Sequence, residues 1–212
     1  MTVTWDEFSR EVLPAVPGCP PSVAENAIRQ AVIDLCNKAR VWREDLTAIN
    51  IVANTAEYTL TPPAGTRIIA PVNVRYNGES IDPEEEGDMD YEYFDWRELP
   101  AGTPTKYLIM APETLTLNKK PIANITGGLE VRVAVKPTVD ATGCDDLLRD
   151  DWLDVVADGA KASLMMIPNK AWTNYELAMA LKKEFRKGIA RARIRMIQGR
   201  TNKPVRARPL AL

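Results

Sequence analysis

The stretch "LEVRVAVKPTVDATGCDDLLRDDWLDVV", residues 129–156, contains the change of pattern that decides the fold. Its first part alternates apolar with polar or small residues, the period of two that is typical of a half-buried strand. The apolar positions there are Leu129, Val131, Val133 and Val135. After Gly143 the apolar residues recur every three or four positions, which predicts an amphipathic helix. A strand region followed by a helical region indicates an α+β chain.

Towards the C-terminus the helical pattern continues in two segments. The first begins near residue 145 and should end at Pro168, because proline cannot continue a helix. The second, the longest in the chain, has an apolar stripe that steps by three or four residues, with basic residues on the remaining circumference. The stripe consists of Ala171, Tyr175, Ala178, Leu181, Phe185, Ile189, Ala192 and Met196. We expect irregular chain after Gly199.

The N-terminal end also predicts helices. Thr4, with Glu7 three residues later, has capping-box spacing for a short helix that Pro14 and Pro17 terminate. A second amphipathic helix is expected over residues 22–42, with Ser22 as its cap. About four helices from both chain ends should therefore pack into one core.

Between these helices, residues 47–137 carry short strand patterns separated by turn residues. "AINIVA" and "EYTL" flank "NTA" as a predicted hairpin, and Asn77-Gly78 is a strong hairpin signal. We expect a small antiparallel β sandwich or barrel here. The predicted organisation is 1–46 for the N-terminal helices, 47–137 for the inserted β domain, 138–198 for the C-terminal helices and 199–212 for an extended basic tail.

The charge is distributed unevenly along the 212 residues. From residue 182 to the end, eleven Lys or Arg accompany a single acid, Glu184. That segment carries +10, so residues 1–181 carry −12 of the overall −2. Such asymmetry points to a charged partner or to head-to-tail self-association, because each copy offers both signs.

The composition argues against an enzyme and against a cofactor or metal site. The chain has no histidine, which removes the commonest general base and metal ligand. None of its four serines lies in GxSxG, and no phosphate-binding glycine motif is present. The three cysteines, Cys19, Cys36 and Cys144, are dispersed and odd in number, which predicts reduced thiols of a cytosolic protein. No apolar run approaches the roughly 18 residues of a membrane span, so we expect a soluble protein.

The acidic stretch "DPEEEGDMDYEYFDW", residues 82–96, allows three interpretations. The simplest is a solvated loop between strands. Alternatively, its carboxylates face a basic partner or line a passage for DNA, or a carboxylate pair performs glycoside hydrolysis. Spacing of Asp88, Asp90 and Glu92 resembles calcium ligands, but Tyr93 stands where an EF-hand needs glycine. The aromatic residues of this stretch favour some packing role; they are Tyr91, Tyr93, Phe94 and Trp96.

The basic end also has more than one interpretation. The segment from Lys182 to Arg195 fits an ordinary surface helix docked on its core, with a basic face that includes Lys187, Arg191 and Arg195. The tail beyond Gly199 lacks the interleaved aromatics of a single-strand binder and the bulky amphipathic helix of a membrane binder. Its charge and its apolar end, "PLAL", favour a peptide that inserts into a partner and orders on binding; a disordered solubilising tail is the alternative.

Together these patterns resemble the head-to-tail adaptor (connector) proteins of tailed bacteriophages. The resemblance is carried by "WDEFSREVLPAVPGCPPSVAENAIRQAVIDLCNKARVW" at 5–42, by the closing strand "VRVAVKPTVD" at 131–140, and by "ADGAKASLMMIPNKAWTNYELAMALKKEFRKGIARAR" at 157–193. It covers nearly the full chain with loosely defined structural residues rather than one specific motif.

The resemblance implies a structural virion protein, not an enzyme: a ring of twelve copies under the portal that joins head to tail and continues the DNA channel. Its partners would be the portal, other tail proteins, further copies of itself and DNA passing without sequence-specific contact, with no cofactor and no membrane. It would be assembled in the host cytoplasm and reside in the virion neck. The portal contact would comprise Arg200, Lys203, Arg206, Arg208, Leu210 and Leu212. Facing a neighbour or the channel would be Glu84, Glu85, Glu86, Asp88 and Asp90. A DNA-binding or packaging accessory protein that uses the basic C-terminal segment is the main alternative.

Overall fold

The computed structural model describes residues 2–92, 95–98, 100–111 and 113–199. The chain divides into two compact units, which we call the helical unit and the β unit. The helical unit combines Met1–Trp42 with Lys136–Leu212, and the β unit is Arg43–Val135. One unit is therefore built from both ends of the chain, with the other inserted between them.

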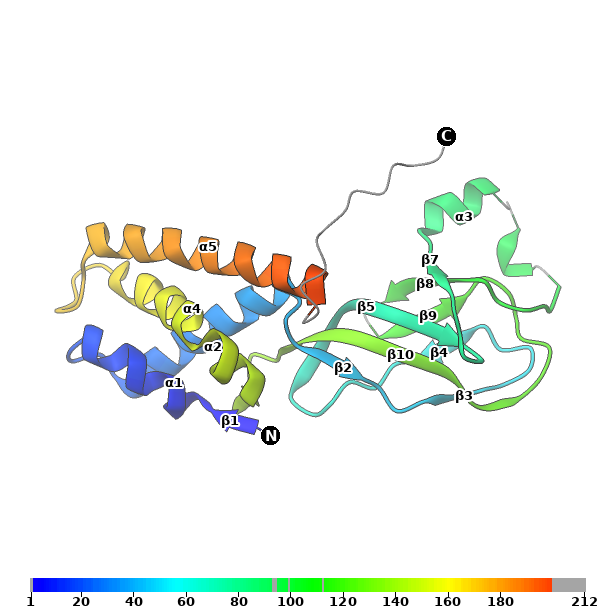
Figure 1. The fold of residues 1–212 in the computed structure, drawn as a ribbon, viewed down its shortest axis with the longest axis horizontal. Helices are drawn as coiled ribbons and strands as arrows, with labels where there is room; N and C mark the ends of the chain where they lie inside the picture. The colour runs from blue at the N-terminus through cyan, green and yellow to red at the C-terminus, as the bar shows by residue number, and fades with distance from the viewer. Residues whose placement is uncertain (1, 93–94, 99, 112, 200–212) are drawn as a thin grey trace. The chain divides into compact units, whose positions relative to one another are not determined.

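Four helices pack against one another in the helical unit, where they lie side by side (Figure 1). They are α1 (Trp5–Val12), α2 (Pro21–Ala39), α4 (Asp146–Met165) and α5 (Tyr175–Gln198). A short turn of 3-10 helix, Leu13–Ala15, follows α1. Strands β1 (Thr2–Thr4) and β11 (Gly143–Asp145) form a two-stranded antiparallel sheet. The predicted α+β class with a helical core from both chain ends is confirmed.

The ends of α1 and α2 differ in detail from the predictions. Thr4 occupies the N-cap position of α1, but its side chain makes no capping hydrogen bond. Helix α2 begins at Pro21, whose fixed φ suits the first helical turn, so Ser22 is not its cap. The same helix ends at Ala39 rather than residue 42, because Arg40 adopts a left-handed φ of 52°.

Helices α4 and α5 approach closely through two reciprocal glycine contacts. A Cβ on Gly159 of α4 would lie 2.8 Å from the ring of Phe185, and one on Gly188 of α5 would lie 2.7 Å from both methyl groups of Val155. Each helix therefore accepts a large side chain of the other where it has none of its own. Buried Ala178 and Ala192 extend this close packing along α5.

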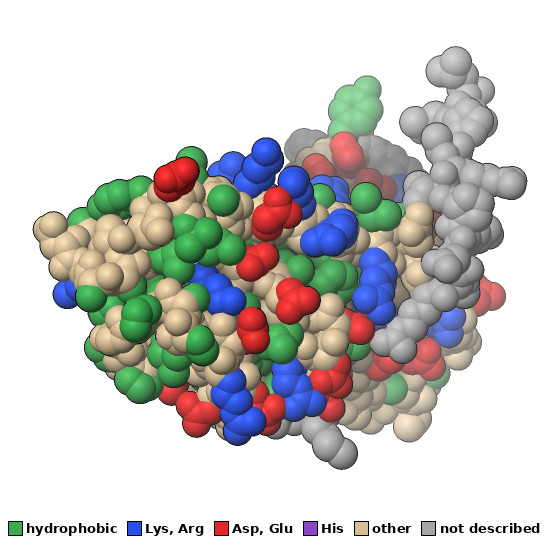
Figure 2. Space-filling model, turned by 60° about the vertical axis from the view of Figure 1, so that its left-hand side comes forward, with side chains coloured by type: hydrophobic (Ala, Val, Ile, Leu, Met, Phe, Trp, Pro, Cys, Tyr) green, Lys and Arg blue, Asp and Glu red, His purple; other side chains and the backbone are tan. Residues whose placement is uncertain are grey.

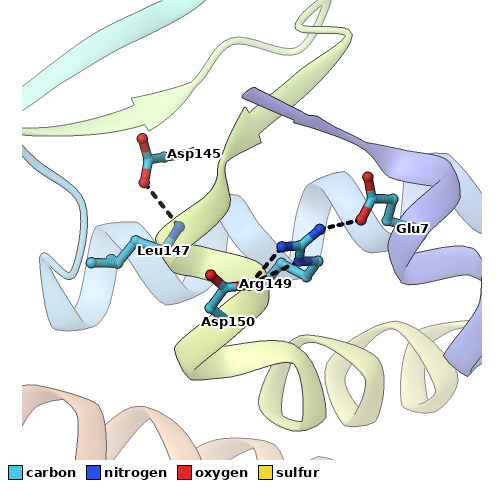
Figure 3. A network of polar contacts seen from close by, with 5 residues as sticks. All are labelled: Glu7, Asp145, Leu147, Arg149 and Asp150. Atoms are coloured by element: carbon cyan, nitrogen blue, oxygen red, sulfur yellow. Dashed lines mark hydrogen bonds and ion pairs between the residues drawn. The ribbon is translucent and has the colours of Figure 1, made fainter. Parts of the chain in front are cut away.

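The start of α4 is fixed by a polar network (Figure 3). Asp145 is the N-cap, and its carboxylate accepts a hydrogen bond of 2.9 Å from the backbone N–H of Leu147. The guanidinium of Arg149 bridges Asp150, at 2.8 Å, and Glu7 of α1. These contacts join the N-terminal helix to the helix that follows the β insertion.

Two sheets form the β unit. The strands of the first follow the order β2-β10-β5-β6, with β3 also on β10; their bounds are β2 Arg43–Asp45, β3 Ile49–Ile51, β5 Thr66–Tyr76, β6 Glu79–Ser80 and β10 Ile125–Pro137. The second has the order β4-β9-β8-β7, with β4 Glu57–Thr59, β7 Asp82–Pro83, β8 Lys106–Ala111 and β9 Thr114–Leu117. Apolar residues of β10 that alternate in the sequence, such as Leu129 and Val133, are fully buried.

Two predicted hairpins have different outcomes. Asn77 and Gly78 join β5 to β6 with φ values of 50° and 83°, which confirms the hairpin and its twisted turn. The hairpin around "NTA" is wrong: Asn54 does turn the chain, but β3 pairs with β10 and β4 pairs with β9. The two flanking segments thus belong to different sheets. The strands are also not all antiparallel, since β7 and β8 pair in parallel.

Candidate assembly surfaces

The acidic stretch contains a short helix, α3 (Glu86–Glu92), where the simplest interpretation was a loop. The helix is anchored by Met89, which is fully buried and clusters with Trp96 and Leu108. Trp96 belongs to a 3-10 turn, Trp96–Glu98, that follows α3. The burial of Met89 helps to hold this short helix on the β unit.

Three of the five predicted acidic residues form ion pairs within the β unit. Glu84 contacts Lys106 at 2.6 Å, and both side chains are partly buried. Glu86 and Asp90 both face Arg97, whose guanidinium also lies 4.5 Å from the Trp96 ring centroid. Such pairs tie α3 to its surroundings more than they offer charge to a partner.

Asp90 has a further structural role. Its carboxylate accepts a hydrogen bond of 2.8 Å from the indole N–H of Trp96. This explains how a buried tryptophan keeps its polar atom satisfied. The predicted packing role is confirmed for Trp96 and wrong for Tyr91, which is 94% exposed. Tyr93 and Phe94 lie outside the described residues.

The remaining acids, Glu85 and Asp88, are exposed. With Tyr91 they recur every three residues: Glu85 directly precedes α3, Asp88 and Tyr91 lie on it, and all three side chains are exposed. We call Glu85, Asp88 and Tyr91 the acidic stripe. Tyr91 is the most exposed of the large hydrophobic residues that the structure describes.

The predicted basic face of α5 is partly engaged inside the helical unit. Lys187 contacts Glu184 at 2.7 Å, and this hydrogen bond lowers the pKa of the Glu184 carboxyl. Arg195 reaches Asp151 of α4 at 3.3 Å and lies 5.4 Å from the ring centroid of Trp152. Arg191 is exposed. Arg195 therefore helps to dock α5 on α4, whereas Lys187 pairs with a residue of its own helix.

A groove of about 910 Å³ runs between α2, α4 and α5. Its lining is Gln30, Ala31, Asp34, Lys38, Gly159, Ala162, Ser163, Met166, Lys182, Phe185, Arg186, Ile189, Ala190 and Arg193. The apolar part of this lining consists mainly of small side chains, which leave the space open. The charged part of the lining consists of four cations and one carboxylate. That carboxylate, Asp34, is paired with Lys38 at 2.9 Å. We call this feature the basic groove.

Figure 2 shows one face of the molecule, on which acidic and basic side chains are mixed and hydrophobic side chains lie between them. Exposed hydrophobic residues also occur near both ends of α5: Tyr175, Leu177, Met179, Ile194 and Ile197. Surfaces of this kind bind other proteins through shape and charge together.

The cysteines offer no reactive centre. All three are free and buried. Burial raises the pKa of the Cys36 thiol strongly and that of Cys144 to about 12, so both stay protonated near neutral pH. Burial likewise raises the pKa of Cys19. Within the described residues, no group of three or more Cys, Asp or Glu side chains is placed to hold a metal ion.

No helix among the described residues combines the length and apolar character needed to cross a bilayer. The predicted tail contacts, Arg200, Lys203, Arg206, Arg208, Leu210 and Leu212, lie outside the described residues. Their assignment to a partner stays a prediction.

The chain has a helical unit built from both of its ends, an inserted β unit and exposed surfaces of mixed charge. These features suit a structural protein that binds other proteins. Comparison with known families agrees: residues 4–209 match the SU10 adaptor protein family. The chain belongs to this family and is a structural adaptor protein of a bacteriophage, a component of the virion. No curated protein matches it.

Sequence reasoning found the charges but missed the groove. The acidic stripe could have been found from the three-residue spacing of Glu85, Asp88 and Tyr91, had a helix been expected there. The groove gives no such signal, because its small residues come from three helices that are distant in sequence.

Proposed function

We propose that this adaptor forms a ring of twelve copies beneath the portal, joins the head to the tail and continues the DNA channel. The observation that carries the proposal is the combination of the full-length family match with the segregated charge of the chain. A ring of copies with both signs of charge can join neighbours in one direction around an axis.

The portal contact that we propose lies in the C-terminal segment. Arg200, Lys203, Arg206 and Arg208 would form charge-assisted hydrogen bonds with carboxylates of the portal, since guanidinium groups match carboxylates in geometry. Leu210 and Leu212 would fill apolar grooves, and Lys187, Arg191 and Arg195 would add long-range attraction. The acids from Glu84 to Asp90 would face a neighbouring copy or the channel.

The test is co-sedimentation with nuclease-treated portal rings of the same phage, comparing the full chain with a chain truncated after Gln198. We expect the full chain to saturate at one copy per portal subunit and the truncated chain to lose most binding. A Leu210→Ala/Leu212→Ala variant and a variant with the four tail cations changed to Gln separate the apolar from the charged contribution.

Binding of both chains to the portal with equal affinity would remove the tail from the contact. Absence of portal binding, together with duplex DNA binding that falls linearly with the logarithm of salt concentration, would replace the ring proposal with the DNA-binding alternative. Circular dichroism of each variant at 222 nm checks that the helical unit is folded.

A further inference from the structure

The acidic stripe of α3 carries charge that the β unit does not use. Met89 is buried against the β unit, whereas the side chains of Glu85, Asp88 and Tyr91 are exposed. Within the described residues, neither Glu85 nor Asp88 forms an ion pair, whereas Glu84, Glu86 and Asp90 all do. Exposed tyrosines are enriched at the energetic centres of protein contacts, and the carboxylates beside Tyr91 add a charge that a partner can match.

The basic groove carries the opposite charge. Lys182, Arg186 and Arg193 line it from α5, are exposed, and form no ion pair with another described residue. The side chains of Phe185 and Ile189 lie between them and are almost buried, so the groove has an apolar floor beneath cationic groups. Such a site fits an anionic segment that also has an apolar or aromatic anchor.

We propose that the basic groove of one adaptor copy receives the acidic stripe of a second copy. Tyr91 would lie on the floor formed by Phe185 and Ile189, and Glu85 and Asp88 would pair with Lys182 and Arg186. This contact deepens the ring proposed above and rests on it.

The dimensions agree with this pairing. The seven residues of α3 rise about 10 Å, and the part of α5 between Lys182 and Arg193 rises about 17 Å. The short helix therefore fits within the length of the groove. A tyrosine ring also buries a large area when it is covered, which gives a small contact an anchor.

Charge and symmetry select a second copy as the occupant. The C-terminal segment of the chain, with Arg200, Lys203, Arg206 and Arg208, would place like charges beside the groove and is disfavoured there. When the groove of one copy binds the stripe of another, the resulting pair of copies still has one free groove and one free stripe. Copies can therefore be added until the series closes into a ring.

The first experiment exchanges charges on the full-length chain. A stripe variant, Glu85→Lys/Asp88→Lys, and a groove variant, Lys182→Glu/Arg186→Glu, should each associate with themselves about tenfold or more weakly than the unchanged chain. A mixture of the two should regain assembly with the variants alternating, because the intact groove matches the intact stripe and the two exchanged surfaces also match in charge. The chain with all four substitutions should regain the full assembly. Controls are Glu79→Lys and Lys183→Glu, exposed residues of the same charge outside the stripe and the groove.

The second experiment places a photoreactive benzoylphenylalanine at position 91 and identifies the cross-linked peptides by mass spectrometry. Sedimentation velocity measures association in the first experiment, and both experiments use the free chain and its complex with portal rings. Cross-links from position 91 to α2, α4 or α5 of another copy, together with the charge rescue, support the proposal.

The inference is overturned if the fourfold variant shows no rescue, if the controls weaken association equally, or if position 91 cross-links to portal, tail protein or another part of the adaptor. It is also overturned if the unchanged chain fails to associate with itself in either setting. Loss of portal binding by a chain that still associates through the groove would count against the proposed function instead.

Discussion

The contact between Gly188 of α5 and Val155 of α4 predicts that one added methyl group destabilises the helical unit. In Gly188→Ala the new Cβ would lie 2.7 Å from both methyl groups of Val155 and 3.2 Å from its Cβ. Val155 is buried, and a β-branched side chain in a helix has essentially one rotamer. The clash must therefore be relieved by separation of α4 and α5, at the expense of their packing.

The expected magnitude combines two opposing effects. Overpacking of a well-packed core costs about 1–3 kcal/mol, and replacement of glycine by alanine inside a helix contributes about 1 kcal/mol of stability. Gly188→Ala should thus lower the free energy of unfolding by about 0–2 kcal/mol. Val155→Ala removes two methyl groups from a buried site and should cost about 2 kcal/mol.

The double variant is the decisive measurement. In Val155→Ala/Gly188→Ala the methyl at 188 occupies space vacated at 155, so its total loss should be about 1–3 kcal/mol smaller than the sum of the single losses. Urea unfolding followed at 222 nm reports on the helical unit, and Gly87→Ala, which has no atom within 4 Å of the new Cβ, is the control. Additive losses, within about 0.5 kcal/mol, would refute the close approach of the two helices.

Three further predictions concern the same unit. Asp145→Ala should cost about 1 kcal/mol because it removes the N-cap of α4, whereas Asp145→Asn should retain most of the stability in thermal unfolding. Arg149→Ala breaks the partly exposed link to Glu7, so it should cost at most about 1 kcal/mol, and the loss should shrink in urea titrations at high salt. Cys36 and Cys144 should react with a thiol reagent such as DTNB only on unfolding. Burial raises the pKa of both thiols above the values in the unfolded chain, so their contribution to the free energy of unfolding is present below about pH 9 and is lost as the pH rises further. The variant Cys36→Ala/Cys144→Ala should therefore lose less stability at alkaline pH than the unchanged chain.

Much of the fold could be predicted because its signals are local. The alternation from Leu129 to Val135 predicts the strand β10, and Asn77-Gly78 specifies a turn through its own backbone preferences. The stripe that includes Ala178, Phe185 and Ile189 likewise predicts the buried side of α5. In each case neighbouring residues carry the information.

Other features depend on distant parts of the chain. The turn at Asn54 is local, but which strands pair on either side of it depends on β9 and β10, more than 50 residues away. Among the residues of α3 whose burial is described, Met89 is the buried one, so no helical period appears in its acidic sequence. The basic groove depends on small residues of three helices, among them Ala31, Gly159 and Ala162.

The distribution of ion pairs gives a physical reason why some charges can serve assembly and others cannot. Arg97 pairs with Glu86 and Asp90, and Asp151 pairs with Arg195, so these groups would have to lose a partner before they could gain another. Glu85 and Asp88 of the acidic stripe, and Lys182, Arg186 and Arg193 of the basic groove, form no ion pair with another described residue and so lose only water. Contacts between exposed charges are screened over about 10 Å at 0.1 M salt. Self-association through these surfaces should therefore weaken as salt rises, while the internal packing of both units persists. Each copy can then remain a folded monomer until others are present at high local concentration, which suits a protein that is assembled into a particle.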